Sequence, residues 1–387
     1  MNYLRNTFKG VSKPLLIMPL LLAVISITMM VSTAGNNGFR TVVVQSAAYV
    51  LGCIFVVIIA NMDYSVVEGI EKKLYIGSVV FLLTVYLPFI GVELNGARSW
   101  INLGFTTFQP SELVKLSFIL LFAHYLTRHR NDLRTFRGVA MALAYSLPFL
   151  LIVTKEDLGS GLVFGIVWVI MIFYAGIDGA LFAKCAAAVG ISIPIIYHFL
   201  DEYQKDRIRA FLHPDNLSIA ANYQIYQSKT AIGSGGFFGK GLFHGTQKDL
   251  NFLPVQNSDF IFAVIVEELG FIGGIAVIAI YSVLMYNIAN VAKRCQDMTG
   301  SLIVIGILGM FVFQIFENIG MTMSVMPATG ITLPFLSYGG SSILSNMMAM
   351  GLVINVAIRN RGVQFDKEQL KSKESIISDA DYASMQQ

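Results

Sequence analysis

Several ionisable residues of this 387-residue chain fall in or beside long apolar runs, where charge is costly and each is a candidate for function. They are the pair Glu112 and Lys115, then Asp157, Asp259, the pair Glu267 and Glu268, and Glu317 beside Asn318. A carboxylate in apolar surroundings holds a proton more tightly than in water, so it can act as a general base near neutral pH. Acid–base chemistry is therefore one function that these residues could serve.

Each group also has a structural explanation. Glu112 and Lys115 stand three residues apart, so they could form an ion pair within the first turn of a helix. Asp157 or Asp259 could be an ordinary N-terminal helix acid that favours the helix dipole. The deeper glutamates could hold helices together through buried hydrogen bonds. The residue types alone leave both explanations open.

The chain as a whole is too apolar for a soluble protein. Hydrophobic residues make up 55% of it and charged residues only 13%, whereas an average soluble protein has roughly 25% charged residues. Its mean hydropathy is +0.66 and its net charge is +3. These values predict an all-α polytopic membrane protein, and they exclude a disordered chain, a disulfide scaffold and a nucleic-acid binder.

Ten apolar runs are long enough to cross a bilayer, which takes roughly 20 helical residues. The first run follows a short basic tail and is too long for the apolar part of a cleaved signal peptide, so we expect it to be retained. The runs lie near residues 14–31, 40–61, 73–92, 110–127, 136–154, 159–176, 179–199, 259–289, 300–323 and 340–358. We therefore expect about ten transmembrane helices in one membrane domain, residues 14–358.

Lysine and arginine cluster on alternate connections, and this asymmetry orients the chain because cytoplasmic loops carry the positive charge. The basic groups include Lys72 and Lys73 after the second run and Arg359 after the tenth. The rule predicts cytoplasmic tails over residues 1–13 and 359–387. It also predicts that the longest connection, residues 200–258 between spans seven and eight, is extracellular.

Motif searches do not settle the chemistry. The sequence has neither a nucleophile-elbow motif nor a zinc-protease motif, and its five histidines show no metal-ligand spacing. An outward-facing membrane enzyme and a transporter both fit a multi-span protein with carboxylates near its outer face.

A series of short stretches, in order along the chain, resembles the shape, elongation, division and sporulation (SEDS) family. The series is specific as a whole and covers nearly all of residues 15–359. The form of these stretches and the short tails are most similar to the RodA branch of the family. The other branches are FtsW and SpoVE. The stretches are residues 95–101 with 109–116, 157–161, 223–228, 231–236, 259–263 with 267–270, 327–330 and 334–342.

The resemblance implies a peptidoglycan glycosyltransferase in the bacterial cytoplasmic membrane. Such an enzyme polymerises lipid II at the outer face during cell elongation and rod-shape maintenance, with inversion at the anomeric carbon and release of undecaprenyl pyrophosphate. The implied partners are a class B penicillin-binding protein, which crosslinks the product, and other membrane proteins of the elongation complex. A division-type polymerase and a lipid II flippase are the alternatives.

The resemblance also assigns residues to roles. The essential acid of the family corresponds to Asp259, and the outward cations are candidates to stabilise the pyrophosphate leaving group. The substrate-binding candidates are Arg98, Glu112, Lys115, Asp157, Arg207, Arg209, Lys240 and Ser337. No metal ligands are assigned, which leaves a divalent cation, Mg²⁺ or Mn²⁺, open as a cofactor.

Overall fold

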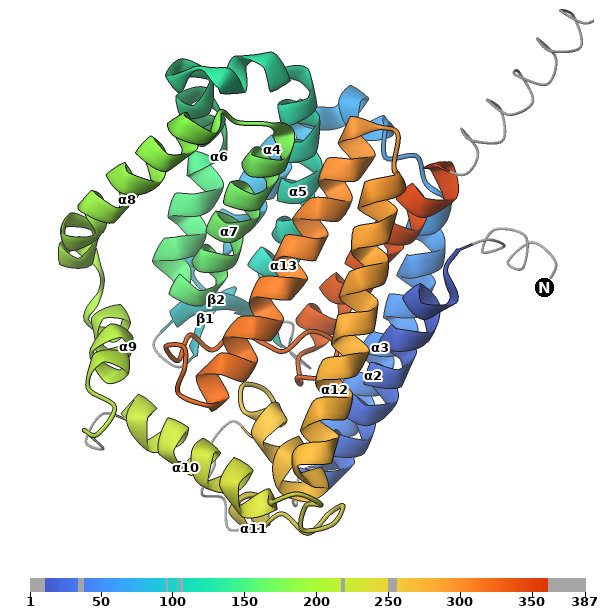
Figure 1. The fold of residues 1–387 in the computed structure, drawn as a ribbon, viewed down its shortest axis with the longest axis vertical. Coiled ribbons are helices and arrows are strands. Elements are labelled where there is room, and N and C mark those ends of the chain that lie inside the picture. The colour runs from blue at the N-terminus through green and yellow to red at the C-terminus, as the bar shows by residue number, and fades with distance from the viewer. Residues whose placement is uncertain are drawn as a thin grey trace, which may run out of the picture.

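A computed structural model describes residues 11–33, 38–94, 97–102, 104, 107–216, 220–249 and 256–360. Most of both predicted tails therefore lies outside the described residues. Long helices form a bundle whose axes run roughly side by side (Figure 1). They are α2 (Lys13–Ser32), α3 (Gly38–Asn61), α4 (Val66–Leu83), α5 (Pro110–Arg128), α6 (Phe136–Glu156), α7 (Leu158–Ala175), α12 (Ile261–Arg294), α13 (Met298–Thr322) and a last helix, Gly340–Asn360. Helix α8 (Gly179–Phe199) angles away from this bundle (Figure 1).

The chain is an all-α polytopic membrane protein, as the composition predicts. Seven of the described helices are long and apolar enough to cross a membrane, whereas α4, α5 and α8 fall outside that set. Each of the ten apolar runs nevertheless overlaps one described helix. The number of ten membrane crossings remains a prediction.

The third run was placed too late in the sequence. We expected a helix near residues 73–92, but α4 covers Val66–Leu83 and is followed by a 3₁₀ turn, η1 (Thr84–Tyr86). Leu87 then adopts an extended conformation, because the residue before a proline, here Pro88, is disfavoured in a helix. The charged first turns of α4, which the hydropathy pattern assigns to a connection, are helical.

A small antiparallel sheet, not expected from the sequence, follows η1. Strand β1 (Gly91–Leu94) pairs with β2 (Ala97–Asn102), and β2 pairs with β3 (Thr107–Phe108). In this register Val92 stands opposite Trp100, and Ile101 stands opposite Phe108. The sheet leads directly into α5, and it sets Ser99 and Trp100 beside the first turn of that helix.

The long connection, residues 200–258, is largely helical where it is described. It contains α9 (Glu202–Leu212), α10 (Ala220–Gly235) and the short α11 (Thr246–Asp249). All three lie toward one end of the bundle, and α8 leads to them along its edge (Figure 1). The extracellular placement of this connection is a prediction that rests on charge asymmetry.

Helix α12 is broken at Gly270, whose φ of 70° and ψ of −170° interrupt the helix. A side chain here would collide with backbone atoms of Phe237 and Gly239. The connecting segment approaches so closely that it bonds the broken turn: Lys240 N–H donates to the Glu267 carbonyl at 3.0 Å, and Phe271 N–H donates to the Gly236 carbonyl at 2.9 Å. The part of α12 before Gly270 is therefore a separate short helix, which explains why the run is long for one crossing.

The buried glutamates of this short helix hold it in place. Glu267 accepts bonds from Lys240 Nζ at 2.7 Å and from Gln247 N–H at 3.0 Å. Glu268 accepts from Phe243 N–H at 3.0 Å and from the Ser32 hydroxyl of α2. The expectation that these glutamates have a structural role, made through buried hydrogen bonds, is confirmed. Both carboxylates bind the connecting segment that packs against the break in α12.

Candidate active site

A cavity of about 210 Å³ opens where the sheet, α9 and the ends of several bundle helices meet. Its walls combine the first turns of α5 and α7, the turn before α12, and the later part of α13. These helix ends lie on one side of the bundle because α13 runs opposite to α5 and α7 (Figure 1). The lining residues are Ser99, Trp100, Gln109, Glu112, Lys115, Asp157, Ser160, Val163, Tyr203, Arg207, Ser258, Asp259, Gln314, Thr329, Gly330, Ile331, Thr332 and Tyr338.

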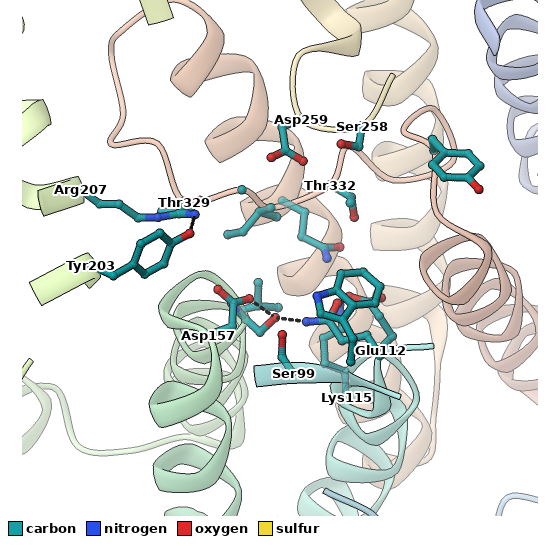
Figure 2. Close-up of a pocket in the computed structure, with 18 residues that line it drawn as sticks. Ser99, Glu112, Lys115, Asp157, Tyr203, Arg207, Ser258, Asp259, Thr329 and Thr332 are labelled. Atoms are coloured by element: carbon teal, nitrogen blue, oxygen red, sulfur yellow. Dashed lines mark hydrogen bonds and ion pairs between the residues drawn. The ribbon is translucent and has the colours of Figure 1, made fainter. Parts of the chain in front are cut away.

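Asp259 lies in the turn just before α12 and points into this cavity (Figure 2). It does not cap the helix, since Phe260 holds the N-cap position and no side chain there makes a capping hydrogen bond. Asp259 therefore does not serve as the cap of α12. Protein atoms surround the carboxyl closely, and this desolvation raises the pKa of Asp259 to about 6 despite the nearby Arg207 guanidinium.

The backbone on both sides of the carboxylate is fixed by neighbouring side chains. Asn318 of α13 donates to the Asp259 carbonyl at 3.0 Å and to the Ile331 carbonyl at 2.8 Å. The Ser337 hydroxyl donates to the Ser258 carbonyl at 2.5 Å. The backbone of Asp259 is thus held independently of its carboxylate, which makes its own side-chain hydrogen bond with Ser258.

Asp157 makes the capping contacts that Asp259 lacks. It is the N-cap of α7, and its carboxylate accepts from Gly159 N–H at 3.2 Å, Ser160 N–H at 3.0 Å and the Ser160 hydroxyl at 2.6 Å. These bonds satisfy orphan donors at the helix start. The structural explanation therefore holds for Asp157, although the residue also lines the cavity.

Glu112 and Lys115 form the intrahelical ion pair that was one of their two open explanations, with Lys115 Nζ 2.8 Å from Glu112 Oε1. Both side chains are buried, at 6% and 3% exposure, so the pair is desolvated rather than a surface contact. Glu112 Oε2 and Gln314 Oε1 are buried beside the cavity without a hydrogen-bond partner among the described residues. Unpaired buried acceptors are costly, and a polar substrate group could satisfy these two.

Arg207 enters the cavity from α9, opposite the bundle helices (Figure 2). One guanidinium nitrogen, Nη1, donates to the Ala328 carbonyl at 2.7 Å, and the other, Nη2, donates to the Tyr203 hydroxyl. The guanidinium carbon also lies 4.6 Å from the centre of the Tyr203 ring. These contacts hold the charge of Arg207 at a fixed place in the cavity.

Four other candidates do not line the cavity. Arg98 is exposed on β2, and Arg209 forms exposed ion pairs with acids of its own helix. Lys240 is paired with Glu267, at 2.7 Å. Ser337 is buried and holds the turn around Ser258. Of the eight substrate-binding candidates, the structure therefore gathers Glu112, Lys115, Asp157 and Arg207 around Asp259.

Sequence reasoning missed several uncharged residues of the site. Tyr203 precedes Arg207 by one helical turn, a spacing that could have indicated the contact. Thr329 and Gly330 belong to a stretch that we used only for its family resemblance. Thr329 donates from its hydroxyl to the buried Glu317, which lies on α13 behind the cavity wall.

The described residues do not build a metal site. No group of three or more histidine, cysteine, aspartate or glutamate side chains that could hold a metal ion occurs among them. Lys115 and Arg207 supply positive charge in the cavity instead.

Together, the fold and the cavity define a class: a polytopic membrane protein with a desolvated carboxylate and fixed cations at one end of its helix bundle. The family model described as "Cell cycle protein", which covers FtsW, RodA and SpoVE, matches residues 8–362. The chain belongs to this family, the SEDS family.

Relatives in other bacteria support this assignment. Stage V sporulation protein E of Bacillus subtilis is 38% identical over 314 residues, covering 80% of this chain and 85% of that protein. The peptidoglycan glycosyltransferase MrdB of Escherichia coli is 35% identical over 309 residues, covering 79% and 82% of the two chains. Relatives from several branches of the family therefore align over most of their length.

Solved structures agree with the fold. A chain of a peptidoglycan synthase complex that coordinates polymerization and crosslinking aligns with a TM-score of 0.78 at 26% identity, covering 91% of this chain and 98% of that one. The rod shape determining protein RodA of Thermus thermophilus aligns with a TM-score of 0.65 at 26% identity, covering 90% and 97%.

Proposed function

We propose that the cavity around Asp259 is the active site of a peptidoglycan glycosyltransferase that polymerises lipid II. One observation carries the proposal: the Asp259 carboxylate, which neither caps its helix nor is paired with a lysine, points into a polar cavity at one end of a membrane bundle (Figure 2). The names of family members, including the Escherichia coli glycosyltransferase MrdB, supply the substrate class.

The mechanism follows from what each side chain can do. Asp259 accepts the proton of an acceptor sugar hydroxyl while the oxygen attacks the anomeric carbon of the second lipid II molecule. The bond from that carbon to the pyrophosphate oxygen breaks, and its electron pair leaves with undecaprenyl pyrophosphate. Positive charge in the cavity stabilises this leaving group.

The other carboxylates at the site, besides Asp259, favour direct displacement with inversion at the anomeric carbon. A covalent intermediate would require a second carboxylate free to act as a nucleophile. Asp157 accepts three bonds at the start of α7, Glu112 is paired with Lys115, and Glu317 accepts from Thr329. Each has at least one oxygen engaged in a structural contact, which supports a single base and a single displacement.

The depth of the cavity supports polymerisation over lipid II transport. A flippase needs polar groups along a path through both leaflets, whereas the lining residues come from one end of α5, α7 and α13 and from the adjoining segments. We place this end at the outer face of the cytoplasmic membrane, with both termini inside, on the charge asymmetry of the connections.

We further propose a role in elongation and rod shape, with a class B penicillin-binding protein as the partner. The RodA-like form of the sequence motifs supports the elongation role. A structural relative that belongs to a complex coordinating polymerization and crosslinking supports the partnership. Co-purification from native membranes tests the partner, and unchanged full activity with every class B protein tried would contradict an activating role.

The decisive experiment supplies labelled lipid II to the purified protein, with and without a class B partner whose own transpeptidase is inactivated. Glycan strands longer than the disaccharide are the expected product. A protein that moves lipid II across vesicle membranes and forms no glycan strands would overturn the proposal in favour of the flippase.

A further inference from the structure

A second cavity, of about 430 Å³, lies on the side of the bundle between α2, α3 and the last helix, Gly340–Asn360. Leu16 and Leu20 of α2 form one wall, and Cys53 and Val57 of α3 form the other. Leu20 and Cys53 are exposed, so the cavity is a groove that opens at the surface. The residues that line this groove and those that line the active-site cavity are different.

The groove runs along the helix axes. Each wall is made by residues four positions apart, which is about one helical turn. The floor is made by the buried side chains of Met347, Met350 and Ile354 of the last helix. From Met347 to Ile354 a helix rises about 10 Å. All three helices are among those long and apolar enough to cross a membrane, so the groove opens toward the hydrocarbon of the bilayer.

Contacts on both sides of the groove hold its walls and floor in place. A Cβ atom on Gly52 would lie 2.7 Å from Met347 Cγ, so α3 packs directly onto the last helix at the floor. Helices α2 and α3 lie side by side (Figure 1). They are joined farther along by a buried hydrogen bond, from Gln45 Nε2 to Ser26 Oγ at 3.0 Å.

A positive charge stands at one end of the groove. Lys13 is exposed at the first position of α2, three residues before Leu16 and seven before Leu20, so the three side chains share one face of the helix. On α3, Val57 lies about one turn before Asn61, the last residue of that helix. The groove therefore begins about one turn from these helix ends. Its length of about 10 Å keeps it within one leaflet of a hydrocarbon core about 30 Å thick.

The size and chemistry of the groove select its ligand. Two turns of a helix occupy about 800–1,200 Å³, given a diameter of about 10–12 Å, so the groove is too small to take in a partner helix. Water would find no polar partners along these apolar walls, and an empty groove would lose packing contacts on one side. A hydrocarbon chain is narrow and flexible enough to follow the groove. Lys13 adds attraction for a phosphate at the membrane surface.

We propose that the groove binds one acyl chain of an anionic phospholipid, whose phosphate is held by the ammonium group of Lys13. The lipid belongs to the leaflet opposite the active-site cavity, because Ser32, at the other end of α2, donates to Glu268 beside the connecting segment. It stabilises the fold by joining α2 to α3 at the end that the bond between Ser26 and Gln45 does not reach. This binding goes beyond the proposed function and does not depend on it.

The test titrates the delipidated protein in detergent with phosphatidylglycerol, which is anionic, and with phosphatidylethanolamine of the same chains, which is zwitterionic. Native mass spectrometry counts the bound lipid, and one saturable site for phosphatidylglycerol is expected. Cys53→Trp, whose larger side chain fills the groove, should abolish this site. Cys185→Trp is the matched control, because it makes the same replacement on α8, away from the groove. Lys13→Gln should weaken phosphatidylglycerol binding about fivefold, the effect of one lysine near an anionic lipid surface, and leave phosphatidylethanolamine binding unchanged.

A second measurement leaves the groove unaltered. The chain has three cysteines, so Cys185→Ser together with Cys295→Ser leaves Cys53 as the single thiol. Phosphatidylglycerol should protect this thiol from a membrane-soluble maleimide, and phosphatidylethanolamine at the same concentration should protect it much less. This result decides the question even if Cys53→Trp fails to fold.

The inference is overturned if the two lipids bind the parent equally tightly, or if Cys53→Trp retains phosphatidylglycerol as the parent does, because the lipid is then only part of the general shell. A Cys53 thiol that neither lipid protects would also overturn it. A protein that co-purifies with the parent and is lost with Cys53→Trp, without any effect of lipid, would assign the groove to a partner instead.

Discussion

The side-chain amide of Asn318 donates to the backbone carbonyl of Asp259 at 3.0 Å, so α13 holds the proposed base by its main chain and not by its carboxylate. The same amide donates to the Ile331 carbonyl. A change confined to the Asp259 side chain therefore leaves these backbone contacts in place. The effect of such a substitution on the rate can then be assigned to the chemistry of the carboxylate.

Asp259→Asn should fold and insert normally but lose polymerisation about 10²- to 10⁴-fold, because Asn keeps the shape of the side chain and cannot act as a base. The assay is glycan strand formation from lipid II, with thermal unfolding in detergent as the check on folding. Glu267→Gln is the control, since its Oε1 atom can still accept from Gln247 N–H. Its loss of polymerisation should be much smaller. A well-folded Asp259→Asn that makes near-normal strands would falsify the assignment of the base.

The pH dependence of polymerisation should show an acid limb near pH 6. Burial raises the pKa of Asp259 to about 6, and the base form is lost as the pH falls through that value. The rate should fall about tenfold per pH unit well below it. Initial rates measured across this range check the prediction. An acid limb near the ordinary pKa of an exposed aspartate would show that the carboxyl is not desolvated during the reaction.

Asp157 should respond to substitution as a helix cap. Asp157→Asn should keep most of the stability, because Asn caps helices about as well as Asp, whereas Asp157→Ala should cost about 0.5–2 kcal/mol. Thermal unfolding of the two variants in the same detergent makes the comparison. If Asp157→Asn unfolds as readily as Asp157→Ala, the three bonds to Gly159 and Ser160 do not account for its role.

The break in α12 should make Gly270 intolerant of any side chain. A Cβ there would stand 2.3 Å from the Gly239 nitrogen, and the backbone conformation alone costs about 1–3 kcal/mol for other residues. Gly270→Ala should therefore unfold at a markedly lower temperature. Gly165→Ala in α7 is the matched control, because no atom beyond the neighbouring backbone of its own helix lies within 4 Å of its added methyl group. Equal stability of the two variants would mean that the connecting segment does not pack against the break.

The topology can be tested by labelling single introduced cysteines in intact cells. Asp215, exposed after α9, should react with an impermeant thiol reagent when replaced by cysteine, whereas a cysteine at Lys367 should be protected. The charge asymmetry of the connections gives the reason. Protection at position 215 together with labelling at position 367 would reverse the orientation.

The sequence by itself determined the class of protein, because apolar runs of bilayer length and a low charge content leave few other folds open. The same reasoning located the ionisable residues that matter, since a charge beside an apolar run is rare. It also showed that Glu112 and Lys115 could pair, because the pairing depends only on helical spacing, and the structure contains this ion pair. Each of these features is local in the chain.

Only the tertiary structure showed which of two residues of the same type has a structural role and which faces the cavity. Asp157 and Asp259 both precede an apolar helix in the sequence, yet one caps α7 and the other faces the cavity. Arg207 and Arg209 are two residues apart, but a helix turns these positions to different faces, so one enters the cavity and the other pairs at the surface. Gly330 comes between Arg207 and Asp259 because contacts from α9 and α13 place it there. The contact of Arg207 with the Ala328 carbonyl joins residues 121 positions apart, and no local pattern encodes it.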